Sequence, residues 1–277
     1  MKIFECIKDM FNLNRTKSLV DESLITRSSN IKSDNTKREE MKNILKVVNN
    51  ILYETEYHDT HPVFLVIKHY VDIELSSNIS KLLATHDPNQ GKKYNFSDIL
   101  PNQKNSFDQY LYIDSSQNRL SWYDFYSMSR LESCEETIFL GYDSVIAHPW
   151  NINRFMNALT KIAMNNDWQQ QKDNHDIVLF MPYGITFVEN GNHSITKGIL
   201  NNIGNIKTAV IYNVGSIHDE IYTDGVYYYR RRDDSIYAIV ENFNLAVVFE
   251  IGSLIYSNRH NPDMNIRFHS KRIADYE

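Results

Sequence analysis

Cysteine, glycine and proline are scarce in this 277-residue chain, which contains 2, 9 and 6 of them. The two cysteines, Cys6 and Cys134, have no Cys-x-x-Cys partner, so the sequence predicts neither a disulfide framework nor a cysteine zinc site. A reducing cytoplasm is the compartment that this usage favours. The few glycines argue against a nucleotide fold that depends on several glycine-rich loops.

Long apolar runs and an excess of basic residues are also missing. No run approaches the roughly 18 apolar residues of a membrane-spanning helix, so we expect no membrane association. The first residues, MKIFECIKDM, lack the apolar core and the cleavage site of a signal peptide. The formal net charge of −6 gives no overall attraction for nucleic acid, although a local basic patch is compatible with it.

Helical spacing organises the first part of the chain. Residues 2–12 predict a short helix, and the polar stretch Asn14–Asp34 predicts a weakly ordered linker. An apolar face over Asn35–Tyr57 predicts a strong helix, and Thr60-His61-Pro62 predicts the start of another. We therefore expect an arm and linker at 1–34, a helical region at 35–107 and an α+β domain at 108–277. The predicted fold class is α+β, with a helical N-terminal part followed by a mixed sheet with flanking helices.

The most informative stretch is Ile177–Leu200, which reads IVLFMPYGITFVENGNHSITKGIL. Two apolar runs around a Pro-Tyr-Gly turn predict a hairpin, and the polar glycine turn after it leads into a helix over Ser194–Asn202. A helix over Ile152–Asn165 precedes this unit, and a strand over Thr208–Val214 follows it. The other predicted elements are short strands over Tyr110–Ile113, Arg119–Trp122, Ile138–Leu140 and Gly225–Arg232, and a buried helix over Phe243–Tyr256.

The glycine turn at Asn190–Ser194 is the strongest candidate for a binding site. It places backbone N–H groups and short polar side chains at a helix N-terminus, which attracts anions because its N–H groups are unpaired and its dipole end is positive. The structural alternative is an ordinary Asn-Gly turn in which Ser194 only caps the helix. Both interpretations stay open at the level of the sequence.

The order strand, helix, hairpin, turn, helix, strand, together with Asn190-Gly191-Asn192-His193-Ser194, resembles the ParB/sulfiredoxin-like superfamily. The resemblance covers roughly Phe139–Val214, and the remainder has the general character of an uncharacterised bacterial family. In the superfamily, a Gly-x-His-Arg or related turn holds nucleotide phosphates at a helix N-terminus. This chain has Ser194 where many members carry arginine, and it lacks the sulfiredoxin cysteine at Asn192, so sulfiredoxin redox chemistry is not expected.

The resemblance implies that the loop containing His148 and the helix containing Arg154 face the glycine turn. Arg154 would then supply the guanidinium that position 194 lacks. His193 is the candidate catalytic acid or base, or a donor to a phosphate oxygen. Asn190, Gly191, Asn192, Ser194 and Lys197 are the further candidates for phosphate or nucleotide binding, together with His148 and Arg154. A turn histidine and a solvated lysine are the structural alternatives for His193 and Lys197. No protein-bound metal site is predicted.

These residues predict a nucleotide-binding protein that acts as a nucleoside-triphosphate hydrolase or a phosphotransferase. ATP or another nucleotide would be the ligand, with Mg²⁺ as its usual companion. The first alternative is a non-catalytic module on the same scaffold, which binds a protein partner through its N-terminal helices in a plasmid, conjugation or phage-defence system. A nuclease is the second alternative, and the acidic balance and the lack of a carboxylate cluster for metal count against it.

Overall fold

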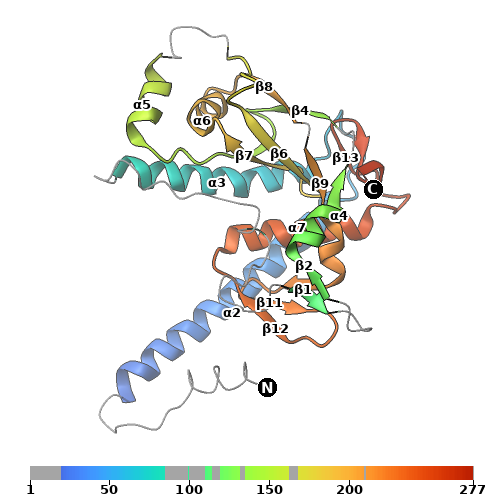
Figure 1. Ribbon diagram of the computed structural model, residues 1–277. Helices are drawn as coiled ribbons and strands as arrows, with labels where there is room; N and C mark the ends of the chain where they lie inside the picture. Colours follow the sequence, from blue (N-terminus) through green and yellow to red (C-terminus); the bar gives the residue numbers. More distant parts are fainter. Residues whose placement is uncertain are drawn as a thin grey trace.

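The computed structural model describes residues 20–84, 99, 110–113, 119–131, 135–161, 168–208 and 210–276. The helix predicted over residues 2–12 lies outside these residues. Helices and short sheets alternate along the described chain (Figure 1), which confirms the α+β class. Among the described helices, none combines the length and the apolarity that crossing a lipid bilayer requires.

A mixed sheet of five strands, in the order β3-β9-β6-β7-β5, forms the centre of the fold. Its strands are β3 Arg130–Leu131, β9 Ile211–Asn213, β6 Asp176–Met181, β7 Ile185–Asn190 and β5 Ser144–Ile146. The β6–β7 hairpin is antiparallel, and β5 and β9 flank it in parallel. Apolar runs on β6 and β7 are almost entirely buried because helices and other strands cover both faces of the sheet.

Figure 1 shows helices beside and below this sheet, with the long blue helix extending away from it. The long helices are α2 Val20–Ile51, α3 Val63–Ala84 and α7 Phe243–Asn258, and the shorter ones are α4 Trp122–Ser129, α5 Ile152–Lys161 and α6 Asn192–Leu200. Helix α3 contacts β5 and α7, and α7 also contacts α2. Helix α5 packs against α6, away from the α3–α7 contact. The hairpin thus has α6 at one end and the α3–α7 layer at the other.

Smaller sheets complete the architecture. They are β4 Glu136–Phe139 with β8 Asn205–Thr208, β1 Tyr110–Ile113 with β2 Arg119–Ser121, β13 Arg267–Phe268 with β14 Lys271–Arg272, and the antiparallel set β10 Ile221–Thr223, β11 Tyr227–Arg230 and β12 Ile236–Ile239. In the described chain, the 3₁₀ turn η3 Gly215–Asp219 lies between β9 and β10, and η4 Ile273–Tyr276 follows β14.

Helix α7 anchors the core because it is apolar on nearly every face. Its residues Leu245–Ile251 are buried, and the ring of Tyr183 from the β6–β7 turn packs directly against Gly252. Because a Cβ at position 252 would overlap that ring, glycine is required for the hairpin to approach the helix so closely.

Two sequence predictions need correction, and one strand was missed. The linker predicted over Asn14–Asp34 is helical from Val20 onward, so the boundary at 34/35 falls inside α2. The strand predicted over Thr208–Val214 is two strands, β8 and β9, which belong to different sheets. Strand β5 was not predicted, because three residues are too short to show an alternating pattern. The helices near Met41 and after Pro62, the hairpin and α7 are confirmed.

Candidate functional site

Gly191 joins β7 to α6 in a conformation that only glycine adopts readily. Its φ is +82°, and it occupies the N-cap position of α6 without forming a side-chain cap. A Cβ here would lie 2.5 Å from the carbonyl oxygen of Asn174 and would also overlap the ring of His175. The tight turn therefore depends on the absent side chain, and the obstruction comes from the protein itself rather than from a ligand.

Helix α6 begins at Asn192, two residues before the predicted start at Ser194. His193 and Ser194 consequently lie in the first helical turn rather than in the turn before it. The resemblance to the ParB/sulfiredoxin-like superfamily required His193 to lie in the turn ahead of the helix, so its position inside α6 counts against that resemblance. The first-turn N–H groups of α6 nevertheless receive no side-chain cap, which leaves the positive end of the helix without one.

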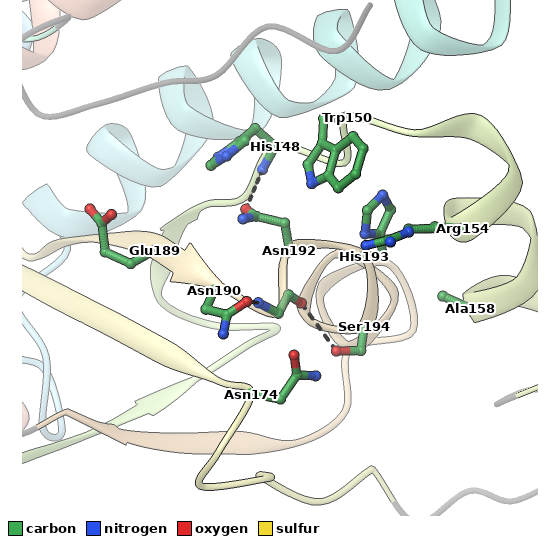
Figure 2. Close-up of a pocket in the computed structure, with 11 residues that line it drawn as sticks. His148, Trp150, Arg154, Ala158, Asn174, Glu189, Asn190, Asn192, His193 and Ser194 are labelled. Carbon is green, nitrogen blue, oxygen red and sulfur yellow. Dashed lines mark hydrogen bonds between the residues drawn. The ribbon is translucent and has the colours of Figure 1, made fainter. Parts of the chain in front are cut away.

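A pocket of about 480 Å³ lies at this helix start (Figure 2). The residues that line it come from α5 and the loop before it, from the loop before β6, and from the β7–α6 junction: His148, Trp150, Arg154, Ala158, Asn174, Glu189, Asn190, Gly191, Asn192, His193 and Ser194. The prediction that His148 and Arg154 share a cleft with His193 is therefore confirmed.

Two hydrogen bonds hold the starts of α5 and α6 together. The backbone N–H of His148 donates to Oδ1 of Asn192 at 2.8 Å, and the backbone N–H of Asn151 donates to Nε2 of His193 at 3.3 Å. Asn151 also caps α5, since its Oδ1 accepts from the N–H of Arg154 at 3.0 Å. Asn192, a predicted phosphate- or nucleotide-binding residue, is buried, and its side-chain oxygen holds the His148 loop.

Trp150, Arg154 and His193 form one wall of the pocket. The Arg154 guanidinium lies 5.0 Å from the centroid of the Trp150 ring, and His193 meets that ring edge-on with centroids 5.4 Å apart. Burial and then the positive charge of Arg154 lower the pKa of His193 below its usual value. His193 is therefore neutral near pH 7, and its Nε2 accepts the Asn151 N–H, which places its proton on Nδ1.

Ser194 and His175 form a pair that looks like a nucleophile and its base but has the wrong proton arrangement. The backbone N–H of Gln171 donates to Nδ1 of His175 at 3.0 Å, so the ring proton is on Nε2, and burial lowers the pKa of this ring. Nε2 lies 2.6 Å from Oγ of Ser194 and donates to it, while that hydroxyl donates to the Gly191 carbonyl at 3.1 Å. His175 cannot accept the hydroxyl proton in this state, so Ser194 is a structural residue and not an activated nucleophile.

Lys197 differs from its prediction. It was expected to reach toward an anion at the turn, yet it does not line the pocket. Its side chain is 1 % exposed, and its Nζ has no hydrogen-bond partner among the described residues. Burial lowers the pKa of this amine, since the charged form is disfavoured away from water.

Glu189 supplies a carboxylate to the described lining of the pocket, and Figure 2 shows it at the end opposite Arg154. Within the described residues, no three His, Cys, Asp or Glu side chains come together as a metal site. The residues therefore fit a Mg²⁺ ion only as a companion of a phosphate ligand, with Glu189 as the nearest protein carboxylate in the pocket.

Sequence reasoning missed the residues that support the pocket from outside. Trp168 stacks on His175 with ring centroids 5.0 Å apart and donates from Nε1 to the Ser194 carbonyl at 2.9 Å. Asn174 and Ala158, which line the pocket, were missed as well. No local pattern marks these residues, because each is defined by contacts between segments far apart in the chain.

The comparisons with known proteins give a family but no activity. Residues 26–261 match DUF6710, a family of unknown function, and the chain belongs to this family. No curated protein and no solved structure matches the chain. The functional argument therefore depends on the geometry of the pocket.

Proposed function

We propose that the pocket at the start of α6 binds a phosphate-bearing ligand, with a nucleotide as the leading candidate. The observation that carries this proposal is the first turn of α6, which lacks a side-chain cap and lies in the pocket beside the Arg154 guanidinium. Backbone N–H groups at a helix start and a nearby arginine are the two protein groups that recognise phosphate most directly. Helix α5, by contrast, has its first turn capped by Asn151.

The volume and the walls of the pocket support a nucleotide rather than inorganic phosphate alone. A pocket of about 480 Å³ falls within the range that small organic ligands occupy. Trp150 is half-buried and lies near the first turn of α6, where the phosphates would bind. Its ring offers an aromatic surface on which a nucleotide base could stack. Asn190 lies at the mouth, and its Oδ1 accepts from the Gly191 N–H at 2.9 Å.

Turnover, as a nucleoside-triphosphate hydrolase or a phosphotransferase, would need His193 to exchange a proton. Its Nε2 already accepts the Asn151 N–H, so the neutral ring can donate a hydrogen bond from Nδ1 to a phosphate oxygen, and it could take up a proton only if Nε2 released the Asn151 N–H. Mg²⁺ would neutralise phosphate charge in such a reaction.

The occupied Nε2 and the inactive Ser194–His175 pair favour the second candidate function, a non-catalytic nucleotide-responsive module. In that case a cytoplasmic protein partner would bind the N-terminal helices, and nucleotide binding at the pocket would change its affinity for them. The acidic net charge continues to argue against a nuclease.

The direct test is a thermal-shift and calorimetric screen of ATP, ADP, AMP and GTP, each with and without Mg²⁺. A ligand that binds only the folded state must raise the melting temperature. Arg154→Gln should weaken binding of the best nucleotide by roughly tenfold, the size of one charge-assisted hydrogen bond.

Arg259→Gln is the matched control, because Arg259 also lies over an aromatic ring, that of Tyr256 at 3.8 Å, but does not line the pocket. It should bind like the wild type. Equal loss in both variants would show a general charge effect, and no binding of any nucleotide at millimolar concentration would refute the proposed function.

A further inference from the structure

A second cavity, of about 360 Å³, lies away from the pocket of α6. Its walls come from the start of α3 and the loop before it, the β4–β5 turn, and the β13–β14 turn. The lining residues are Asp59, Thr60, Phe64, Leu65, Phe139, Tyr142, Asp143, Ser144, Phe268 and His269. None of them lines the α6 pocket.

Aromatic rings form a continuous wall of this cavity. Phe64 meets Phe268 edge-on with centroids 5.1 Å apart, Phe268 stacks on His269 at 4.1 Å, and Phe139 meets His269 edge-on at 5.8 Å. The rim carries large apolar side chains that water reaches: Leu65, Phe139 and Tyr142 are 63, 44 and 71 % exposed. Exposed apolar side chains that gather at one cavity mouth mark a binding surface.

The charges of the cavity are acidic. Asp59 and Asp143 line it, and no lysine or arginine is among the described lining residues. His269 Nε2 lies 2.8 Å from Asp143 Oδ1, and His58 Nδ1 lies 3.0 Å from Asp59 Oδ2, so an imidazole ring lies beside each carboxylate. Hydrogen bonds from His58 and Ser270 hold the pKa of the Asp59 carboxyl below its usual value, and Asp59 is charged at neutral pH.

The turn that brings His269 into the cavity is strained. His269 and Ser270 have φ values of +46° and +70°, a region that residues other than glycine rarely occupy. Ser270 is held by Asp59, with its N–H 2.9 Å from the backbone oxygen and its hydroxyl 3.0 Å from Oδ1. Strain that surrounding contacts maintain is concentrated at binding sites.

We propose that this cavity binds an organic ammonium ion with an aromatic or aliphatic body. The rings would surround the body and attract the cation by cation–π contacts, and Asp59 would pair with its charge at the mouth. The same chemical group can come from a free amine or from a lysine side chain, and the aromatic–acidic wall recognises both in the same way.

The test uses a matched set of probes: phenethylamine, the neutral 2-phenylethanol and the anionic phenylacetate, titrated into the full chain by calorimetry at pH 7. Phenethylamine should bind most tightly and phenylacetate least. Equal binding of phenethylamine and 2-phenylethanol would overturn the proposal, and so would the absence of binding by all three at millimolar concentration. Acetyl-Phe-Lys-amide is a fourth probe, which tests where the ammonium ion comes from. If it binds more tightly than phenethylamine, the natural ligand is a lysine side chain of a protein. If it binds more weakly, the natural ligand is a free amine.

Asp59→Asn removes the charge but keeps an oxygen to accept the Ser270 hydroxyl. It should weaken phenethylamine binding roughly fivefold, the effect of one partly solvated charge pair, and leave 2-phenylethanol unchanged. Asp263→Asn is the control, since Asp263 is exposed and does not line the cavity. An unchanged preference for the ammonium in Asp59→Asn, with an unchanged melting temperature, would also overturn the proposal.

Discussion

Glu250 should make the folded chain less stable as the pH rises from about 4.5 to 7. Its side chain lies on α7 and is 8 % exposed, and its Oε1 accepts the Thr223 N–H at 2.6 Å. Burial raises the pKa of this carboxyl from 4.5 to about 7, against the opposing effects of the Thr223 hydrogen bond and the charge of Arg231. Tyr183 and Tyr228 also face it, and the carboxylate raises their pKa further.

The direction of this change in stability follows from the Glu250 pKa, which is lower in the unfolded chain than in the folded chain. Below about pH 4.5 the carboxyl is protonated in both states and no stability is lost. As the pH rises from 4.5 to 7 the unfolded chain ionises first, so the free energy of unfolding falls and then levels above pH 7. A difference of 2.5 pKa units at 1.36 kcal/mol each amounts to about 3 kcal/mol.

Glu250→Gln isolates this effect, because the amide oxygen can still accept the Thr223 N–H but the side chain cannot ionise. Urea unfolding, followed by circular dichroism from pH 4.5 to 8.5, gives the difference in unfolding free energy between the variant and the wild type. That difference should shift by about 3 kcal/mol in favour of the variant as the pH rises. The exposed Glu241→Gln should show no such shift. If the difference in unfolding free energy between variant and wild type stays constant with pH, the claim that burial disfavours the ionised Glu250 carboxylate is wrong.

Three further predictions concern the pocket and the core. Gly191→Ala should lower the free energy of unfolding by about 1–3 kcal/mol in urea melts, because φ is +82° and the added Cβ meets the Asn174 carbonyl; an unchanged melt would show that the turn relaxes freely. His193→Ala should bind nucleotide nearly as tightly as the wild type in calorimetry, and any hydrolysis should fall by about a hundred- to ten-thousand-fold; unchanged hydrolysis would show that His193 has only a structural role. Gly252→Ala should lower the free energy of unfolding by about 1–3 kcal/mol in urea melts, because the added Cβ would overlap the ring of Tyr183; an unchanged melt would contradict the close packing.

The sequence was most predictive where a local pattern decides the structure. The β6–β7 hairpin and α7 were predicted because uninterrupted apolar residues and a tight turn mark them within a short window. The first half of α2 was missed for the opposite reason. Val20–Asp34 is polar, so the sequence has no apolar face at helical spacing that would predict a helix there. Strand β5 and the division between β8 and β9 depend on pairing with distant strands, which no local window contains.

The same distinction applies to the pocket. The sequence identified His148, Arg154 and the glycine turn as neighbours, and the structure brings them together. It did not reveal that Asn192 is occupied by the His148 N–H, that Lys197 is buried, or that His175 donates to Ser194. The first and the last of these facts are hydrogen bonds between residues 44 and 19 positions apart in the sequence, which no local window contains.

The central claim is that the uncapped start of α6 holds a phosphate. The most direct measurement is a titration of ATP, with and without Mg²⁺, into the ¹⁵N-labelled chain, with the backbone amide resonances assigned. We expect the largest amide shifts at Asn192, His193 and Ser194, and we expect Arg154→Gln to reduce them at equal ligand concentration. Saturable binding that leaves these three amides unmoved, or no binding at millimolar ATP, would contradict the central claim.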